Sequence, residues 1–257
     1  MNERLQNVLV GLLAAVAAAS VVAALTSAPS IDPVTTGGHT SDSDAATTSA
    51  AVPDAEEDDE QDEQDDTSLE DLSAALEGED DGAVDVVVIG DDTSNNRSEW
   101  VHLWAERLAD ERPVTVVHWA EQADVAYTTP DVLSESGEGV MLSIWSPARA
   151  GTDIAAAAER VEDFLPDAPT DLVLVNLGVN NDADEVGDQM QDLLDALRGL
   201  VGDGVPVGIV LQAEQVSTPE VNTALADFAA DNGLATLDAT GADGPQDWAE
   251  TIDELLR

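Results

Sequence analysis

The 257-residue chain contains no cysteine and no lysine. Without cysteine it cannot form disulfides, thiolate metal sites or a cysteine nucleophile. Without lysine it cannot form a phosphate-binding P-loop or a Schiff base, because both need a lysine amine. Basic residues are scarce altogether: eight arginines stand against 55 aspartates and glutamates, which gives a formal net charge of −47.

This charge predicts the environment of the protein. In dilute buffer the repulsion between like charges opposes a compact state, whereas molar salt screens charges over a Debye length of about 3 Å. From Val84 onward alone there are 35 acidic residues and 7 arginines, so the excess is not confined to the N-terminal part. We therefore expect adaptation to high salt, and we exclude nucleic acid as a partner because its phosphates are also anionic.

The first 28 residues differ from the rest of the chain. Residues Val8 to Ala28 carry no charge and are mostly Val, Leu and Ala, a length that can cross a hydrocarbon core of roughly 30 Å. Thr26-Ser27-Ala28 resembles a signal cleavage site, but Pro29 follows it and the apolar run exceeds the roughly 7 to 15 residues of a signal peptide. We predict a single-pass anchor in the cell membrane, with Arg4 inside and the C-terminal part extracellular, or a secreted protein if the segment is cleaved.

Residues 29–82 are predicted to form an acidic, Ser/Thr-rich linker. Ten of the thirteen residues from Asp54 to Asp66 are acidic, so this stretch cannot bury enough apolar area to fold. Within the linker, the sequence SLEDLSAAL from Ser68 to Leu76 is typical of a short capped helix. Such a helix could form the edge of the folded domain.

Residues 83–257 show strands alternating with helices. The predicted strands are Val84–Ile89, Val114–His118, Val140–Trp145, Leu172–Asn176, Val205–Leu211 and Leu234–Leu237. The predicted helices are Ser98–Asp110, Thr152–Phe164, Glu185–Val201, Pro219–Asp231 and Gln246–Leu256. This alternation predicts one doubly wound α/β domain with a mainly parallel sheet, whose functional residues lie beyond the C-terminal ends of the strands.

Two segments have the same construction, a buried strand that ends in a polar turn. Residues Val86 to Asn96 read VVVIGDDTSNN, and residues Leu172 to Asp182 read LVLVNLGVNND. They resemble the first and third sequence blocks of the SGNH (GDSL-type) hydrolases. The resemblance implies a flavodoxin-like fold and an esterase framework. In that family a serine nucleophile follows the Gly-Asp turn, whereas here Asp92 stands at the serine position.

The resemblance also supplies candidate oxyanion-hole residues. The segment IWSPARAG after a predicted strand is similar to the family's second block, with Gly151 as the oxyanion glycine. Gly178-Val179-Asn180 matches the Gly-x-Asn of the third block, which implies that the Asn180 side chain donates to the oxyanion. Asn181 stands where the family usually has aspartate.

The fourth family element is altered. The family has Asp-x-x-His before its last helix, and here Asp243 is followed three residues later by Gln246. A glutamine amide can form hydrogen bonds but cannot accept a proton near neutral pH. We therefore predict a degenerate hydrolase-like domain that acts as a binding module for a small-molecule ester, acyl or carbohydrate ligand.

One alternative is an active ester hydrolase with an atypical catalytic set. Asp92 or Ser94 would then lie near the attacking atom, and His118, at the end of a predicted strand, would be the substitute base. The competing interpretation is that Thr93 and Ser94 cap a helix. His102 lies off the apolar stripe of its predicted helix and is expected at the surface.

A second alternative is a divalent-cation site. Asp91 and Asp92 follow one strand, and Asn181, Asp182 and Asp184 follow another, so their oxygens could surround Mg²⁺ or Ca²⁺. In so acidic a chain, neighbouring carboxylates also occur by chance. We therefore predict no metal and no cofactor, and the sequence leaves the oligomeric state open.

Overall fold

The computed structural model describes residues 66–78 and 82–257. Within these two ranges no helix has both the length and the apolar character that a membrane crossing requires. The predicted anchor, Val8 to Ala28, lies outside the described residues, as does most of the predicted linker.

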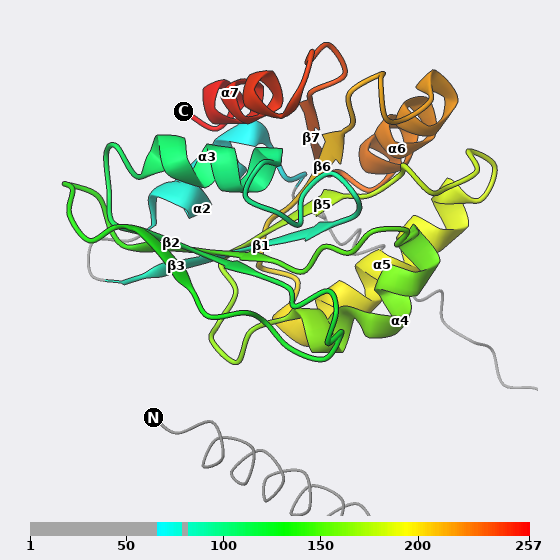
Figure 1. Cartoon of the computed structure of the whole chain (residues 1–257). Helices are drawn as coiled ribbons and strands as arrows, with labels where there is room; N and C mark the ends of the chain where they lie inside the picture. The colour runs from blue at the N-terminus through cyan, green and yellow to red at the C-terminus, as the bar shows by residue number, and fades with distance from the viewer. Residues whose placement is uncertain (1–65, 79–81) are drawn as a thin grey trace, which may run out of the picture. The chain divides into compact units, whose positions relative to one another are not determined.

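The domain is built on a seven-stranded sheet with the order β3-β2-β4-β1-β5-β6-β7 (Figure 1). The strands are β1 Val84–Gly90, β2 Val114–His118, β3 Asp131–Ser134, β4 Leu142–Ser146, β5 Leu172–Asn176, β6 Val207–Leu211 and β7 Ala235–Asp238. Every pair of neighbours is parallel except β2 and β3. Without the edge pair β2 and β3, five strands remain in the order β4-β1-β5-β6-β7. Counted from 1 to 5 along the chain, they follow the flavodoxin-like order 2-1-3-4-5. The predicted α/β fold with a mainly parallel sheet is thus confirmed.

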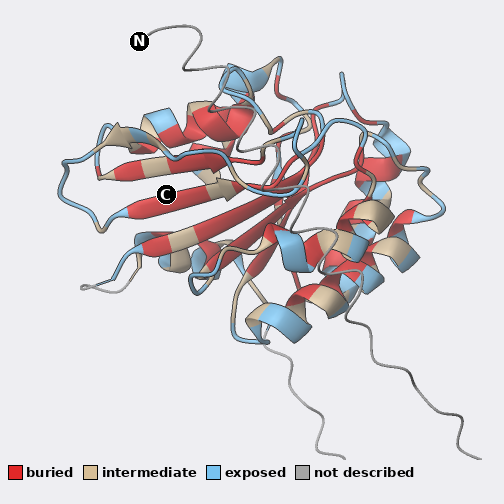
Figure 2. Ribbon diagram, turned by 60° about the horizontal axis from the view of Figure 1, so that its bottom comes forward, coloured by how far each residue is buried: buried red, intermediate tan, exposed pale blue. Residues whose placement is uncertain are grey.

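Helices cover both faces of this sheet. They are α2 Leu69–Glu77, α3 Trp100–Leu108, α4 Ile154–Phe164, α5 Val186–Val201, α6 Pro219–Asp231 and α7 Pro245–Leu255. Helices α2, α3 and α7 pack on one face, and α4, α5 and α6 on the other (Figure 1). Strand β1 supplies Val86 and Val88 to the first core and Val87 and Ile89 to the second, because successive side chains of a strand point to opposite faces. The central strands are therefore buried along their length (Figure 2).

Helix α2 belongs to the folded domain, although its residues fall within the predicted linker. Ser68 and Asp71 form a capping box at its start. Leu72 is fully buried and Leu76 nearly so. An added Cβ at Gly208 would lie 2.7 Å from Leu72 Cδ1, so the absence of a side chain on β6 lets the helix approach the sheet. The folded part therefore begins before residue 83, because two leucines at i, i+4 spacing cover apolar sheet surface.

Strand β3 was not predicted from the sequence. It pairs antiparallel with β2 at the edge of the sheet, with an irregularity between Val114 and Thr115. None of its residues is buried, so it lacks the apolar pattern by which a buried strand is recognised. Its strand conformation depends on the neighbouring edge.

Candidate active site cleft

The candidate site lies where the chain leaves three adjacent parallel strands. Strand β1 runs between β4 and β5. Asp91 and Asp92 follow β1, Gly151 lies in the segment after β4, and Asn180 follows β5. In doubly wound sheets the crevice at the point where the strand order reverses is the usual place for a ligand.

The Asp92 carboxylate accepts hydrogen bonds from the two donors that, by the family resemblance, would bind an oxyanion. Its Oδ2 atom accepts from the Gly151 backbone N–H at 2.9 Å and from Asn180 Nδ2 at 2.9 Å. Gly151 has a φ of 77°, a conformation that favours glycine. Asn180 Nδ2 also donates to the Thr152 carbonyl at 3.1 Å. Three predicted site residues therefore meet, and the acceptor is a carboxylate of the protein itself.

Asp91, by contrast, is fully buried and ties strand ends together. Its Oδ1 accepts from the Thr93 N–H at 3.2 Å and the Thr93 hydroxyl at 3.0 Å. Its Oδ2 accepts from the Val179 N–H at 3.3 Å and from Gln212 Nε2 at 2.8 Å. Burial raises the pKa of Asp91, while these hydrogen bonds act in the opposite direction. The contacts join the ends of β1, β5 and β6.

The interpretation of Thr93 and Ser94 as helix caps is wrong. Helix α3 starts at Trp100, and its N-cap is Glu99, which makes no capping bond through its side chain. The Thr93 hydroxyl instead bonds Asp91 within the turn. The reason is that the polar turn after β1 extends for several residues before the helix begins.

Ser94 does not present its hydroxyl to the solvent beside Asp92. The residue is fully buried, and its Oγ has no hydrogen-bond partner among the described residues. An added Cβ on Gly90 would lie 1.9 Å from this Oγ, so the hydroxyl points at the β1 backbone. The Ser94 carbonyl accepts from Ser146 Oγ at 2.6 Å. This placement gives Ser94 no access to a substrate next to Asp92.

No hydrogen bond between described residues joins Asp243 or Gln246 to Asp92, Gly151 or Asn180. Asp243 and Gln246 are both exposed at the start of α7. Neither side chain forms a hydrogen bond within the described part of the chain, and the Asp243 N–H donates to Asp247 Oδ2 at 2.9 Å. Among the described residues, the hydrogen bonds of Asp92 are made with Gly151 and Asn180 and none is made with a histidine.

The alternative cation site around Asp91 and Asp92 is not among the metal-ligating clusters of the described residues. The two carboxylates accept from separate sets of protein donors. Asn181 is held by the Ile154 N–H at 3.3 Å and by Gln189, while Asp182 and Asp184 are exposed. Among residues 66–78 and 82–257, the metal-ligating side chains that do gather are His102, His118 and Asp131.

His102 is buried, contrary to the prediction of a surface residue. It is 3% exposed and His118 is 8% exposed, and His102 Nδ1 lies 3.1 Å from His118 Nε2. The prediction failed because α3 is buried on two sides, against α7 and against β2, and not only along its Trp100–Trp104 stripe. Burial, and next the neighbouring His102, lower the pKa of His118 to about 4, so His118 is neutral at pH 7. Burial also lowers the pKa of His102.

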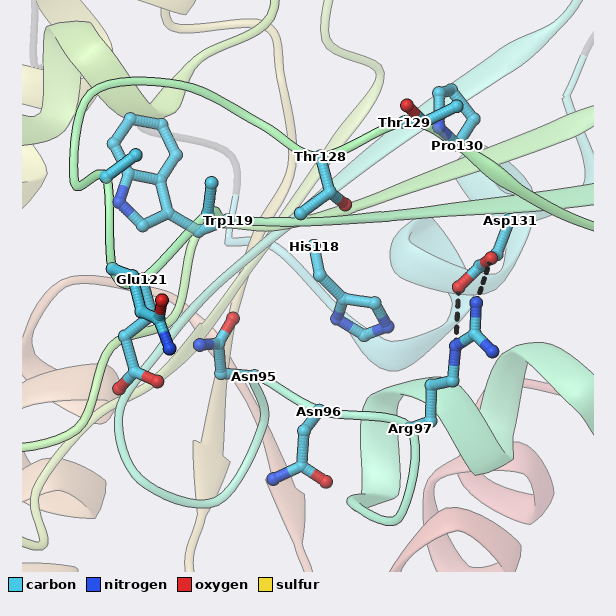
Figure 3. A pocket seen from close by; sticks show the side chains of 13 residues that line it. Asn95, Asn96, Arg97, His118, Trp119, Glu121, Thr128, Thr129, Pro130 and Asp131 are labelled. Atoms are coloured by element: carbon cyan, nitrogen blue, oxygen red, sulfur yellow. Dashed lines mark hydrogen bonds and ion pairs between the residues drawn. The ribbon is translucent and has the colours of Figure 1, made fainter. Parts of the chain in front are cut away.

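His118 lines a pocket of about 780 Å³ (Figure 3). Asp131 lies at its edge and forms a two-point ion pair with Arg97. The predicted substitute base thus contacts another histidine rather than Asp92 or Ser94. Sequence reasoning missed Asp131 because β3 has no strand pattern. The apolar neighbours Val101 and Ala105 were the available signal that His102 lies on a second buried face.

Comparison with known proteins gives similarity in structure alone. No family model matches the chain, and no curated protein does. A two-domain esterase active on acetylated mannans superposes with a TM-score of 0.51 and 14% identity over 75% of this chain, which spans about half (54%) of that protein. A lipase/acylhydrolase from Enterococcus faecalis superposes with a TM-score of 0.45 and 11% identity, and the match covers 67% of this chain and 93% of that protein. A psychrotrophic esterase from Pseudoalteromonas sp. superposes with a TM-score of 0.43 and 13% identity, and the match covers 67% of this chain and 93% of that protein.

The structural match at a TM-score of 0.51 shows the fold of the domain. The described chain has the fold of the SGNH/GDSL-type hydrolases. At 14% identity the likeness shows the fold and does not extend to the chemistry. What the site does must therefore be argued from its own residues.

Proposed function

We propose that this SGNH-hydrolase-like domain has lost serine-dependent ester hydrolysis and serves as a binding module. The observation that carries the proposal is the position of the Asp92 carboxylate, 2.9 Å from both the Gly151 N–H and Asn180 Nδ2. In a hydrolase such donors stabilise negative charge that develops only in the transition state. Here a carboxylate already holds them in the resting protein.

The surrounding residues do not supply a replacement catalytic set. A serine hydrolase needs a nucleophile whose base lies within hydrogen-bond reach. Asp92 stands at the serine position, Ser94 is buried against Gly90, and Gln246 cannot accept a proton near neutral pH. An atypical hydrolase therefore has less support than a binding domain.

The negative charge of Asp92 also bears on the ligand. An exposed carboxylate beside these donors disfavours free acids and favours neutral polar groups or groups that donate hydrogen bonds. We therefore infer a carbohydrate as the first ligand class to test, ahead of an ester or acyl group. The mannan-directed esterase with the same fold makes acetylated glycans a reasonable starting set.

The cellular setting is part of the proposal and rests on the sequence. The apolar segment Val8 to Ala28 would anchor the chain in the cell membrane, with the domain on the extracellular side. The net charge of −47 suits a halophile. Carbonate-resistant sedimentation with membranes, together with removal of the domain by protease added to intact cells, would support this placement. A mature N-terminus near Pro29 would contradict the anchor.

The chemistry can be tested with short-chain p-nitrophenyl esters in molar salt. We expect no turnover above the buffer control for the natural sequence. The double change Asp92→Ser with Gln246→His restores the serine and the histidine of the family pattern, and it should create measurable hydrolysis. Adding Asn180→Ala should then lower the rate by about 10²-fold or more, the usual loss for one oxyanion donor.

Asp92→Ala is the matched control for the esterase test. It removes the carboxylate from the two donors without supplying a nucleophile, so it should stay inactive. Robust turnover by the natural sequence would contradict the proposal, most directly if His118→Ala or Ser94→Ala abolished it. Binding is tested separately by calorimetry with acetylated and unmodified oligosaccharides. Failure to bind any neutral glycan would contradict the inferred ligand class.

A further inference from the structure

Two buried imidazoles and a carboxylate, those of His102, His118 and Asp131, lie close together. Two of these residues, His118 and Asp131, line the pocket in Figure 3. All three come from different elements: His102 from α3, His118 from the end of β2 and Asp131 from the start of β3. One ligand atom of each residue lies within 4.8 Å of the other two. This cluster is separate from the contacts that Asp92 makes with Gly151 and Asn180.

The hydrogen bond between the two histidines leaves one buried ring nitrogen without a partner. His102 Nδ1 and His118 Nε2 lie 3.1 Å apart, so one ring must donate and the other accept. In either arrangement His118 Nδ1 is buried without a partner among the described residues. Buried polar atoms are normally satisfied. Because Nδ1 is not the nitrogen that faces His102, a ligand held between the two rings would bind His118 Nε2 and His102 Nδ1.

We propose that His102, His118 and Asp131 bind one divalent transition-metal ion of the zinc type. Imidazole nitrogen together with carboxylate oxygen is a ligand set suited to such ions. With metal–nitrogen bonds of about 2.0–2.1 Å in tetrahedral geometry, the two nitrogens should be roughly 3.3 Å apart. The observed 3.1 Å already approaches that separation.

The surroundings support the same assignment. Glu106 Oε1 lies 3.7 Å from His102 Nε2, on the side of the ring away from His118. A carboxylate behind a ligating histidine is the usual outer partner of a metal site. Asp131 begins a short, partly exposed edge strand, so its carboxylate can approach the histidines. With three protein ligands, the remaining coordination position would open to the pocket.

Arg97 opposes metal binding. Its guanidinium donates to both oxygens of Asp131 and places a positive charge beside the site. The Arg97 side chain is 71% exposed, so it can leave without disturbing the core. A metal must therefore displace or share this ion pair. Replacing Arg97 should accordingly strengthen binding, an effect that a merely structural cluster would not show.

The test is a titration of the chelator-treated full chain with Co²⁺ alone, in molar NaCl to suppress loose binding to surface carboxylates. We expect one Co²⁺ per chain and a visible absorption band typical of a tetrahedral or five-coordinate ion. His102→Gln and His118→Gln should abolish the band. Asp131→Asn should weaken binding by about tenfold or more, and Arg97→Gln should tighten it severalfold.

Asp182→Asn is the control, because it removes an exposed carboxylate outside the cluster and should leave the titration unchanged. Absence of the band at saturating Co²⁺ would overturn the proposal. So would Co²⁺ uptake that survives both histidine changes. If the histidine variants do not fold, Arg97→Gln decides on its own, since this exposed change leaves the core intact and an unaltered affinity would refute the site.

Discussion

Adjacent aspartates at the end of β1 should respond very differently to loss of charge. Asp91→Asn replaces a fully buried carboxylate that accepts four hydrogen bonds, whereas Asp92→Asn changes an exposed side chain. The two changes are chemically identical and one residue apart. Their comparison therefore isolates the effect of burial and hydrogen bonding.

The magnitude follows from the donors around Asp91. An asparagine has one oxygen, so its NH₂ group must face either Thr93 or the pair Val179 and Gln212. The Thr93 hydroxyl and the Gln212 amide can reorient, but the backbone N–H of Thr93 or Val179 then loses its acceptor. A buried unsatisfied donor costs about 1–3 kcal/mol. Loss of the buried charge offsets part of this, so we expect a net destabilisation of about 2 kcal/mol.

Asp92→Asn should change stability by less than about 0.5 kcal/mol. Its remaining carbonyl oxygen can still accept from both Gly151 and Asn180, and the new NH₂ group can face solvent. The assay is urea unfolding of the two variants in molar NaCl, followed by circular dichroism. Equal unfolding midpoints would refute the argument that Asp91 holds the strand ends together.

Three further predictions concern the domain as a whole. A fragment from Asp66 to Arg257 should lose its structure in dilute buffer and fold in molar NaCl because of its charge; a far-UV spectrum and melting temperature that do not depend on salt would contradict this. Leu72→Ala should destabilise that fragment by about 3 kcal/mol, since it leaves a cavity under α2, and a change below about 1 kcal/mol in urea would show that α2 is dispensable. The pKa of His118 is about 4 in the folded state and roughly 6.5 in the unfolded chain. The stability that comes from keeping His118 neutral is therefore fully present above pH 6.5 and is lost as the pH falls toward 4. In the presence of chelator, His118→Gln should therefore lose less stability than the natural sequence between pH 6.5 and 4, by up to about 3 kcal/mol. An equal pH dependence of the free energy of unfolding in the variant and the natural sequence would exclude a role of His118 in acid unfolding.

Much of the fold follows from local sequence patterns. Apolar runs at β1, β2, β4, β5 and β6 and amphipathic repeats between them predicted the parallel α/β sheet, since such patterns are read over a few neighbouring residues. The Gly-Asp turn after β1 and the Gly-x-Asn after β5 likewise placed Asp92 and Asn180 beyond adjacent strands. Parallel strands bring such ends to one edge of the sheet.

Other features depend on contacts between residues far apart in the chain. Helix α2 is short and lies in an acidic stretch, and its place in the core comes from Leu72 packing beside Gly208. Strand β3 exists because the edge of β2 offers it hydrogen bonds. No local pattern predicts β3, whereas for α2 the sequence predicts the helix but not the part of the sheet that it covers.

The sequence by itself determined which residues stand at the serine and histidine positions of the family resemblance, Asp92 and Gln246, because residue identity is a property of the chain alone. Only the tertiary structure decided that Asp92 accepts from the Gly151 and Asn180 donors. Likewise, only the tertiary structure brought His102 of α3 and His118 of β2 into contact and buried both. Hydrogen bonds and burial depend on distances between side chains that no sequence spacing specifies, because the packing of helices on the sheet sets those distances.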